Sequence, residues 1–168
     1  MGVSISYVPW LRRLVPDINL SYLTGYKKID DDFAVGATIR YFSLGEITFT
    51  NDRGDAIGQF KPNEFSVDIA GARKLSRSFS GGMVLRYVYS NLTGGINVQG
   101  TATKPGQAFA VDVSGYYTNP DIRLGDKDGA FSAGINISNL GSKMSYSQNS
   151  LQRDFLPANL RLGQSTMI

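Results

Sequence analysis

The sequence predicts an all-β protein, an antiparallel transmembrane β-barrel, from three observations. Apolar and polar residues alternate with a period of two, in several segments of about ten residues or more. Short turns alternate with long loops that are rich in Gly and Asn, which is typical of such barrels. Aromatic residues gather at both ends of the apolar face of the strands, where a membrane–water boundary would lie.

Eight strands are expected along the chain. They cover residues 3–8, about 17–27, 33 to about 49, 64–75, about 79–91, 108–118, 130 to about 140, and a short last strand from about 158 to 165. In the fourth strand, Phe65, Val67 and Ile69 alternate with polar residues. In the second, we expect Ile18, Leu20, Tyr22 and Tyr26 to share the apolar face.

The connections between these strands alternate in length. Residues 29–32 and 76–79 are expected to be tight turns, whereas 51–62, 92–106 and 142–157 are long loops. Residues 119–129 fit this order poorly, because a short turn is due there and the segment is about eleven residues long.

A soluble β-sandwich is the main alternative, because its strands alternate in the same way. Two features favour the barrel. Several strands reach about ten residues, whereas typical strands have about five or six. Phe33 and Tyr41 are eight residues apart in one strand, as are Phe109 and Tyr117. That spacing is roughly 26 Å along a strand and roughly 20 Å of height at a tilt of about 40°, close to the apolar band of a barrel.

Composition excludes several classes of site. The 168-residue chain has no Cys and no His, so thiolate nucleophiles, zinc–thiolate sites and imidazole bases are absent. A net charge of +3, with scattered Lys and Arg, does not indicate nucleic-acid binding. Residues 51–55 have too few carboxylates for a calcium loop. We therefore expect no enzyme activity, no metal and no cofactor.

Single charged or polar residues stand at mid-strand on the polar face. We expect a charge belt of Arg40, Asp68, Arg86, Asp112 and Asn136 facing the lumen, because each pair is symmetric about the connection between its strands. Such a belt would stiffen the wall by pairing buried charges. A role in contacting cargo or solute is the alternative.

Four segments resemble the PorV family, the outer-membrane barrels of the type IX secretion system of Bacteroidota, which are related to FadL-like transporters. They are YVPWL at 7–11, YFSLG at 41–45, NISNLG at 136–141 and FLPANLRLG at 155–163. The resemblance covers essentially the whole chain. It implies a barrel of about fourteen strands and roughly twice this length. With no secretion signal and a short last strand, residues 1–168 are expected to form a single partial outer-membrane barrel domain.

The resemblance also implies the function. Proteins of this family bind the C-terminal signal domain of secreted cargo as it leaves the translocon. They shuttle the cargo to the cell-surface attachment complex, where a separate sortase cleaves the signal. The expected partners are therefore cargo, translocon and attachment-complex proteins, and outer-membrane lipid. The alternatives are a FadL-like channel for hydrophobic small molecules and a soluble β-sandwich binding module.

Trp10, Leu11 and Leu14 are the candidate cargo-binding residues. They form an apolar cluster between two prolines, with spacing that would place them on one face of a helical turn or two. Exposed apolar patches commonly mark interaction surfaces. Alternatively, Trp10 anchors in the lipid interface or folds over the lumen. The loop at 93–106 could pair its backbone with cargo, or it is an ordinary surface loop.

Overall fold

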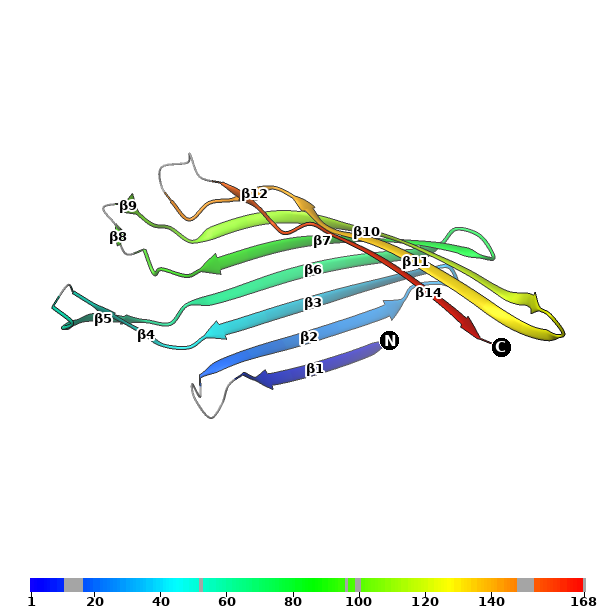
Figure 1. The fold of residues 1–168 in the computed structure, drawn as a ribbon, viewed down its shortest axis with the longest axis horizontal. Coiled ribbons are helices and arrows are strands. Elements are labelled where there is room, and N and C mark those ends of the chain that lie inside the picture. Colours follow the sequence, from blue (N-terminus) through cyan, green and yellow to red (C-terminus); the bar gives the residue numbers. More distant parts are fainter. Residues whose placement is uncertain (11–16, 52, 96, 99–100, 148–152, 168) are drawn as a thin grey trace.

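A computed structural model describes residues 1–10, 17–51, 53–95, 97–98, 101–147 and 153–167, which are all-β. Eight strands form one antiparallel sheet in which each strand pairs with the next along this series (Figure 1). They are β1 (Gly2–Pro9), β2 (Ile18–Lys28), β3 (Phe33–Leu44), β6 (Asn63–Lys74), β7 (Phe79–Asn91), β10 (Gly106–Leu124), β11 (Lys127–Gly141) and β14 (Asn159–Met167). Within the described ranges, no helix has the length and apolar character needed to cross a membrane.

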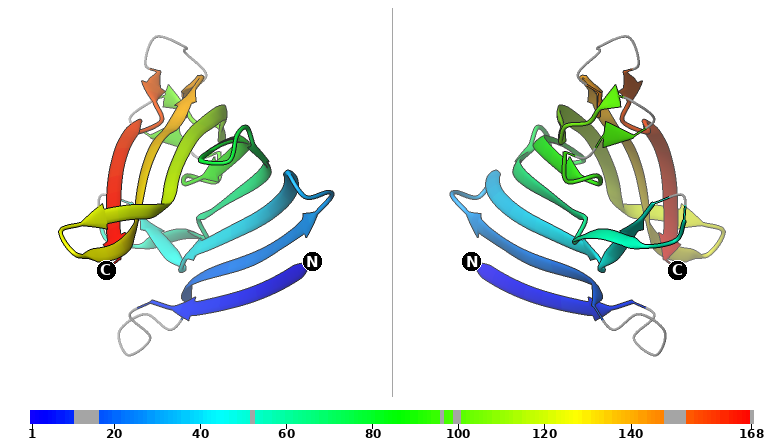
Figure 2. Two further views of the ribbon diagram at one scale, coloured as in Figure 1. Left: turned by 90° about the vertical axis from the view of Figure 1, so that its right-hand side faces the viewer. Right: turned by 90° about the vertical axis from the view of Figure 1, so that its left-hand side faces the viewer.

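The sheet is a curved meander with β1 and β14 at its two edges (Figure 2). Six short strands form three small hairpins outside it. These are β4 (Ile47–Thr50) with β5 (Ala56–Phe60), β8 (Asn97–Val98) with β9 (Thr101–Ala102), and β12 (Lys143–Met144) with β13 (Asp154–Phe155). All three hairpins lie at one end of the sheet, which we call the loop end (Figure 1).

Tight turns lie at the opposite end, called the turn end, together with both termini (Figure 1). Asp30 shapes the first turn, because its Oδ1 accepts hydrogen bonds from the backbone N–H groups of Asp32 and Phe33 at 2.8 and 2.7 Å. In the second, the N–H of Leu75 donates to the carbonyl of Phe79 at 2.8 Å. The predicted alternation of turns and loops is therefore present.

The connection at 119–129, which seemed too long, is also a tight turn. β10 and β11 continue as a paired ribbon as far as Leu124 and Lys127, so only Gly125 and Asp126 turn the chain. Gly125 has φ 67°, a left-handed conformation that suits glycine. The ribbon contains a register shift between Asn119 and Ile122, and this irregularity interrupts the alternation in the sequence.

Besides the longer β10 and β11, two other strand ends differ from those predicted. The third strand ends at Leu44 rather than near residue 49, because Gly45 has φ 85° and turns the chain into the β4–β5 hairpin. The last strand is longer than expected, since β14 runs to Met167 and pairs with β11 from Ser138 to Ala130.

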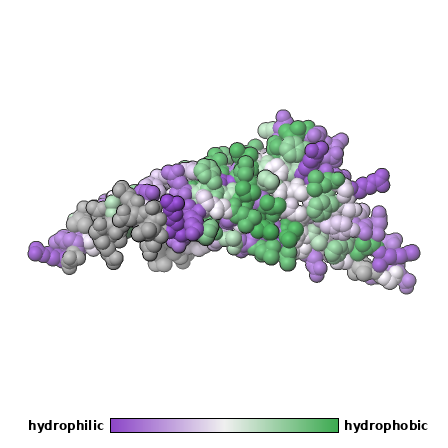
Figure 3. Space-filling view, turned by 90° about the horizontal axis from the view of Figure 1, so that it is seen from above, coloured by the Kyte–Doolittle hydropathy of each residue, from purple (hydrophilic) through white to green (hydrophobic). Residues whose placement is uncertain are grey.

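One face of the sheet is apolar and uncovered. Ile5, Leu23, Ile39 and Val67 follow one another in register across the first four strands of the sheet, and each is at least 37% exposed. Figure 3 shows hydrophobic residues gathered across the middle of one side of the molecule, with hydrophilic residues towards both ends.

The sheet has almost no apolar core. Among the described residues, the buried hydrophobic ones are Ala108, Ala110 and Met144. A β-sandwich would cover its apolar face with a second sheet. In the described part of the chain, the other sheets are only the three two-stranded hairpins at the loop end. The structure thus has the single layer of a barrel wall and lacks the second layer of a sandwich.

Aromatic rings lie at both ends of the apolar face. At the loop end, Phe65 stacks on Tyr89 with ring centroids 5.0 Å apart, and Tyr87 contacts Phe109 at 5.1 Å. At the turn end, the rings of Tyr117 and Phe131 are 6.4 Å apart. The apolar residues of the strands lie between these two rows.

The face assigned to the second strand was wrong. Register pairs Leu23 with Ile39 on the apolar face and Tyr22 with Arg40 on the polar face. Because side chains alternate, Ile18, Leu20 and Tyr26 lie on the polar face with Tyr22.

Candidate functional site

A group of charged side chains lies in the middle of the polar face. It consists of Arg40 on β3, Asp68 on β6, Arg86 on β7, Asp112 on β10 and Asn139 on β11, and is called the charge cluster. The residues come from five neighbouring strands, so the cluster crosses most of the sheet.

Arg86 is the centre of the charge cluster. Its Nε and Nη2 donate to the two carboxylate oxygens of Asp68, both at 3.1 Å. Nη2 also donates to Asp112 Oδ2 at 2.9 Å, and Nη1 donates to the side-chain oxygen of Asn139 at 2.5 Å. The planar guanidinium suits this arrangement, because its donors point in fixed directions towards two carboxylates.

Arg40 extends the cluster by a diagonal contact. Its Cα partner on β6 is Ser66, whose Oγ accepts a hydrogen bond from Arg40 Nε at 3.0 Å. Its Nη2 reaches two residues further along β6, to Asp68 Oδ2 at 2.5 Å. Long side chains can span such diagonal positions on one face of a sheet.

Asn139 replaces Asn136 at the end of the cluster. Among the residues that the structure describes, Asn136 pairs with Ser114 and does not contact the cluster through a hydrogen bond. Instead, Asp112 accepts a hydrogen bond from the N–H of Asn139, and Arg86 donates one to the side-chain oxygen of Asn139. The cause is a β-bulge, because Val111 pairs with Leu140 whereas Val113 pairs with Ile137, which leaves one extra residue on β11. The register expected for Asn136 ignored this extra residue.

The bulge gives Asn139 an unusual backbone. Its φ of 60° is left-handed, which Asn tolerates better than most residues. Its N–H donates to Asp112 Oδ1 at 2.8 Å, and its side-chain amide donates to the carbonyl of Pro157 at 2.9 Å. Asn139 therefore connects the charge cluster to the segment that leads into β14.

Burial makes pairing necessary here. The side chains of Asp68, Asp112 and Arg86 are 10%, 9% and 14% exposed, and Arg40 is 33% exposed. Charges in such surroundings are costly unless they are paired. Two cations and two anions balance, and no buried side-chain N or O of the described residues lacks a hydrogen-bond partner. The arrangement is suited to holding neighbouring strands together through paired charges, rather than to transferring protons.

A second polar network lies at the loop end. The Tyr146 hydroxyl donates to Ser90 Oγ at 2.9 Å, and Ser90 Oγ donates to Glu64 Oε1 at 2.5 Å. Ser90 is only 1% exposed. The N–H of Lys104 also donates to the Tyr146 carbonyl at 2.9 Å. Sequence reasoning missed Tyr146 and Ser90, because residues 56 positions apart form no local pattern.

This network holds the segment around Met144 and Tyr146 against the sheet. Met144 is 7% exposed. A Cβ on Gly106 would lie 2.7 Å from two atoms of Met144 and 2.8 Å from the Tyr146 ring, so only glycine fits there without a shift. Lys143 Nζ also lies 4.6 Å from the ring centre of Phe155, across the β12–β13 hairpin. The loop end is thus a structured rim.

The proposed cargo residues are only partly described. Trp10 lies at the loop end, is 54% exposed, and donates from its N–H to the Ile18 carbonyl at 2.9 Å. Leu11 and Leu14 lie outside the described residues. Within 93–106, the structure describes the β8–β9 hairpin and a hydrogen bond of 2.7 Å from Thr93 to Thr103.

Polar and acidic side chains outside the sheet stabilise its turns and loops. Asn51 Oδ1 accepts hydrogen bonds from the N–H groups of Arg53 and Asp55, both at 2.9 Å. At the turn end, a hydrogen bond from Lys28 at 2.7 Å lowers the pKa of the Asp31 carboxyl below its usual value. No group of three or more metal-ligating side chains occurs in the described ranges.

The comparison with known families agrees with this fold. The family model of the type IX secretion system protein PorV matches residues 1–167, which is nearly the whole chain. A comparison with curated proteins finds no match. The matched family is a β-barrel family of a secretion system and is not a known enzyme family. The chain therefore belongs to the PorV family of type IX secretion system proteins.

Proposed function

We propose that this chain is part of the wall of an outer-membrane β-barrel that binds the C-terminal signal domain of secreted cargo leaving the type IX translocon. The barrel then carries the cargo to the cell-surface attachment complex, where a separate sortase acts on it. Family membership supports the secretion process. The observation that carries the cargo step is the rim of hairpins gathered at one end of the sheet.

The uncovered apolar face supports membrane placement. Ile5 is 78% exposed, Ile69 62% and Leu85 55%, and these residues lie between the two aromatic rows. A soluble protein rarely exposes so continuous an apolar surface. Lipid would cover it, with the aromatic rings at the two interfaces.

Orientation follows from the connections. In outer-membrane barrels, short turns face the periplasm and long loops face outwards. The turn end would therefore lie in the periplasm and the rim outside, where cargo emerges. Trp10 is at this end, and large exposed aromatic residues are common energetic centres of protein interfaces.

Co-purification of cargo tests this proposal. The full protein would be tagged, expressed in its own cells and extracted in mild detergent, and secreted proteins bound to it would be identified. We expect Trp10→Ala to reduce cargo recovery several-fold while the amount of folded barrel stays unchanged. Arg123→Ala is the control, because Arg123 lies at the turn end and is 81% exposed.

A barrel that recovers no secreted protein would contradict the proposal. Equal losses from Trp10→Ala and Arg123→Ala would contradict the assignment of binding to the rim. Recovery of proteins that lack a C-terminal signal domain, to the same extent, would contradict the proposed recognition element.

A channel for hydrophobic small molecules is the second candidate, and one observation favours it. The polar face has an apolar patch near the loop end, where Ile18 pairs with Leu44 and Leu20 pairs with Phe42. All four are half-buried. If the extracted protein carries a bound hydrophobic molecule and no cargo, the channel is favoured over the shuttle.

A further inference from the structure

A hollow of about 640 Å³ lies on the apolar face near the turn between β6 and β7. Phe33, Leu75 and Phe79 line it towards the turn, and Met83 lines it towards the middle of the sheet. Arg73 is the charged residue of its lining.

Glycines create this hollow. Gly81 pairs with Arg73 on one side and with Gly115 on the other, so two adjacent strands lack side chains at this level. A Cβ on Gly81 would lie 3.4 Å from Leu75, and one on Gly115 would lie 3.3 Å from Ile135. The hollow therefore has glycine backbone at its base and larger side chains around it.

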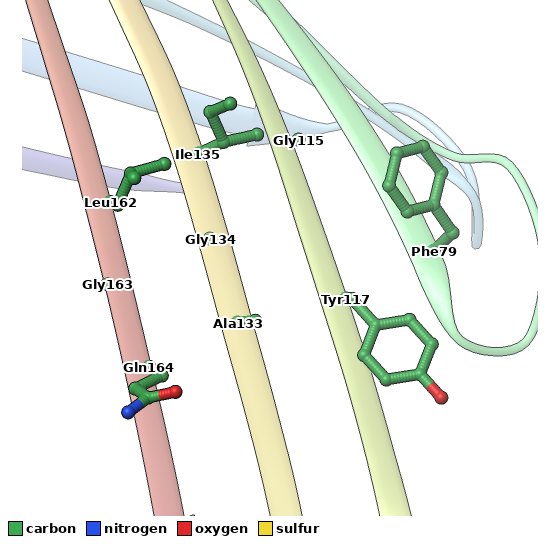
Figure 4. A pocket seen from close by; sticks show the side chains of 9 residues that line it. All are labelled: Phe79, Gly115, Tyr117, Ala133, Gly134, Ile135, Leu162, Gly163 and Gln164. Carbon is green, nitrogen blue, oxygen red and sulfur yellow. The ribbon is translucent and has the colours of Figure 1, made fainter.

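A second hollow of about 560 Å³ adjoins the first and extends to β14 (Figure 4). Phe79, Gly115 and Ile135 line both hollows. In Figure 4, the rings of Phe79 and Tyr117 lie on one side and Leu162 and Gln164 on the other, with small residues between them. The two hollows together are called the turn-end groove.

Arg73 is the cation that lines the turn-end groove. Its neighbour Lys74 lies on the other face of β6, beside the turn that contains Asp31 and Asp32. In the described part of the chain, Arg73 makes no ion pair or hydrogen bond through its side chain, and it is exposed. An Arg with free donors at the edge of an apolar groove matches a ligand with an anionic head and apolar tails.

We propose that the turn-end groove is a binding site for one anionic phospholipid of the surrounding bilayer. The acyl chains lie in the two hollows, and the phosphate group accepts hydrogen bonds from Arg73. This inference rests on the membrane placement proposed for the chain. The groove lies at the turn end, where the headgroups of the periplasmic leaflet would be. The lipid headgroup would therefore lie near Arg73, and the acyl chains would lie along the apolar lining.

Native mass spectrometry of the full protein in mild detergent tests the site. Phosphatidylglycerol would be titrated against phosphatidylcholine with the same acyl chains, and against inorganic phosphate. We expect one tightly held phosphatidylglycerol, with affinity about tenfold above phosphatidylcholine, and no retention of phosphate alone. Arg73→Gln should abolish this preference. Arg123→Gln should preserve it, because that cation lies at the same end but pairs with Asp128 at 3.7 Å.

Equal retention of the two lipids by the unchanged protein would overturn the proposal, as would an unchanged preference in Arg73→Gln. Both results could be obtained with a protein that inserts into vesicles and binds cargo, so they would leave the proposed function intact. A protein that stays soluble without detergent would overturn the membrane placement and the lipid site together.

Discussion

Asp68 and Arg86 lie directly opposite each other on β6 and β7, and two parallel hydrogen bonds of 3.1 Å join the carboxylate to the guanidinium. Arg40 on β3 and Asp112 on β10, the two strands that flank β6 and β7, also form hydrogen bonds with this pair. The pair is thus the centre of a network that links five successive strands of the sheet, from β3 to β11.

Breaking this pair should destabilise the sheet strongly. Arg86→Gln leaves Asp68 and Asp112 without their shared partner, and we expect a loss of about 3–5 kcal/mol in the free energy of unfolding. Asp68→Asn should cost a similar amount, and the double variant should cost less than the sum, because the two residues interact. Urea unfolding in detergent micelles or liposomes measures each value.

Asn136→Ala is the matched control for the cluster. Asn136 lies on the same face as the cluster and pairs with Ser114, two residues from Asp112. We expect Asn136→Ala to lower the free energy of unfolding by at most about 0.5 kcal/mol. A loss as large as that of Arg86→Gln would mean that Asn136, and not Asn139, completes the network.

Substitutions at Asn139 should separate backbone strain from hydrogen bonding. Both Asn139→Gly and Asn139→Ala lose the bonds to Arg86 and Pro157. The φ of 60° is strained for alanine but not for glycine, so the free energy of unfolding of Asn139→Ala should be about 1 kcal/mol lower than that of Asn139→Gly. Equal stabilities in the same urea titration would contradict a left-handed residue at the bulge.

Two glycines should differ sharply in their tolerance of a methyl group. A Cβ on Gly141 would clash with the carbonyl oxygen of Phe109 and lie 2.6 Å from the Cα of Ala110, which are backbone atoms that cannot rotate away. Among the described residues, no heavy atom beyond Gly163 and its two chain neighbours lies within 4 Å of a Cβ on Gly163. We expect Gly141→Ala to prevent refolding or lower the Tm by more than ten degrees or so, and Gly163→Ala to change it little. Similar melting curves for the two variants would contradict the close approach at Gly141.

Charge on the apolar face should be costly only in a bilayer. Leu85 is 55% exposed in the middle of the apolar face, and Leu85→Lys should cost about 2–4 kcal/mol in liposomes. Ile47→Lys is the comparison, because Ile47 is 43% exposed on the β4–β5 hairpin at the loop end. If both variants unfold from liposomes at the same urea concentration as the unchanged protein, lipid does not contact Leu85.

The strand pattern was predictable because alternation and turn residues are local signals. The face of β2 was not, since apolar residues occur on both of its faces. Ile18, Leu20 and Tyr22 outnumber Leu23 in the sequence, but pairing with β1 and β3 places Leu23 on the apolar face. The register between neighbouring strands decides which side chains lie on the apolar face, and the sequence of a single strand does not reveal that register.

The charge cluster shows how far register can be inferred from symmetry. Arg40 pairs with Ser66 rather than Asp68, and Arg86 pairs with Ala110 rather than Asp112. Both shifts are two residues, which keeps the side chains on one face, and the length of arginine spans the difference. The bulge at Asn139 adds one residue, and the sequence has no pattern that announces it.

The central claim is that the apolar face of this sheet contacts lipid, and site-directed spin labelling tests it most directly. The chain contains no cysteine, so single labels can be placed at will. For Ser66→Cys, Val67→Cys, Ile69→Cys and Ala70→Cys in liposomes, we expect high oxygen accessibility at 67 and 69 and low oxygen accessibility at 66 and 70. Free access of a water-soluble relaxation agent to 67 and 69, or the same accessibility at all four positions, would contradict the membrane wall.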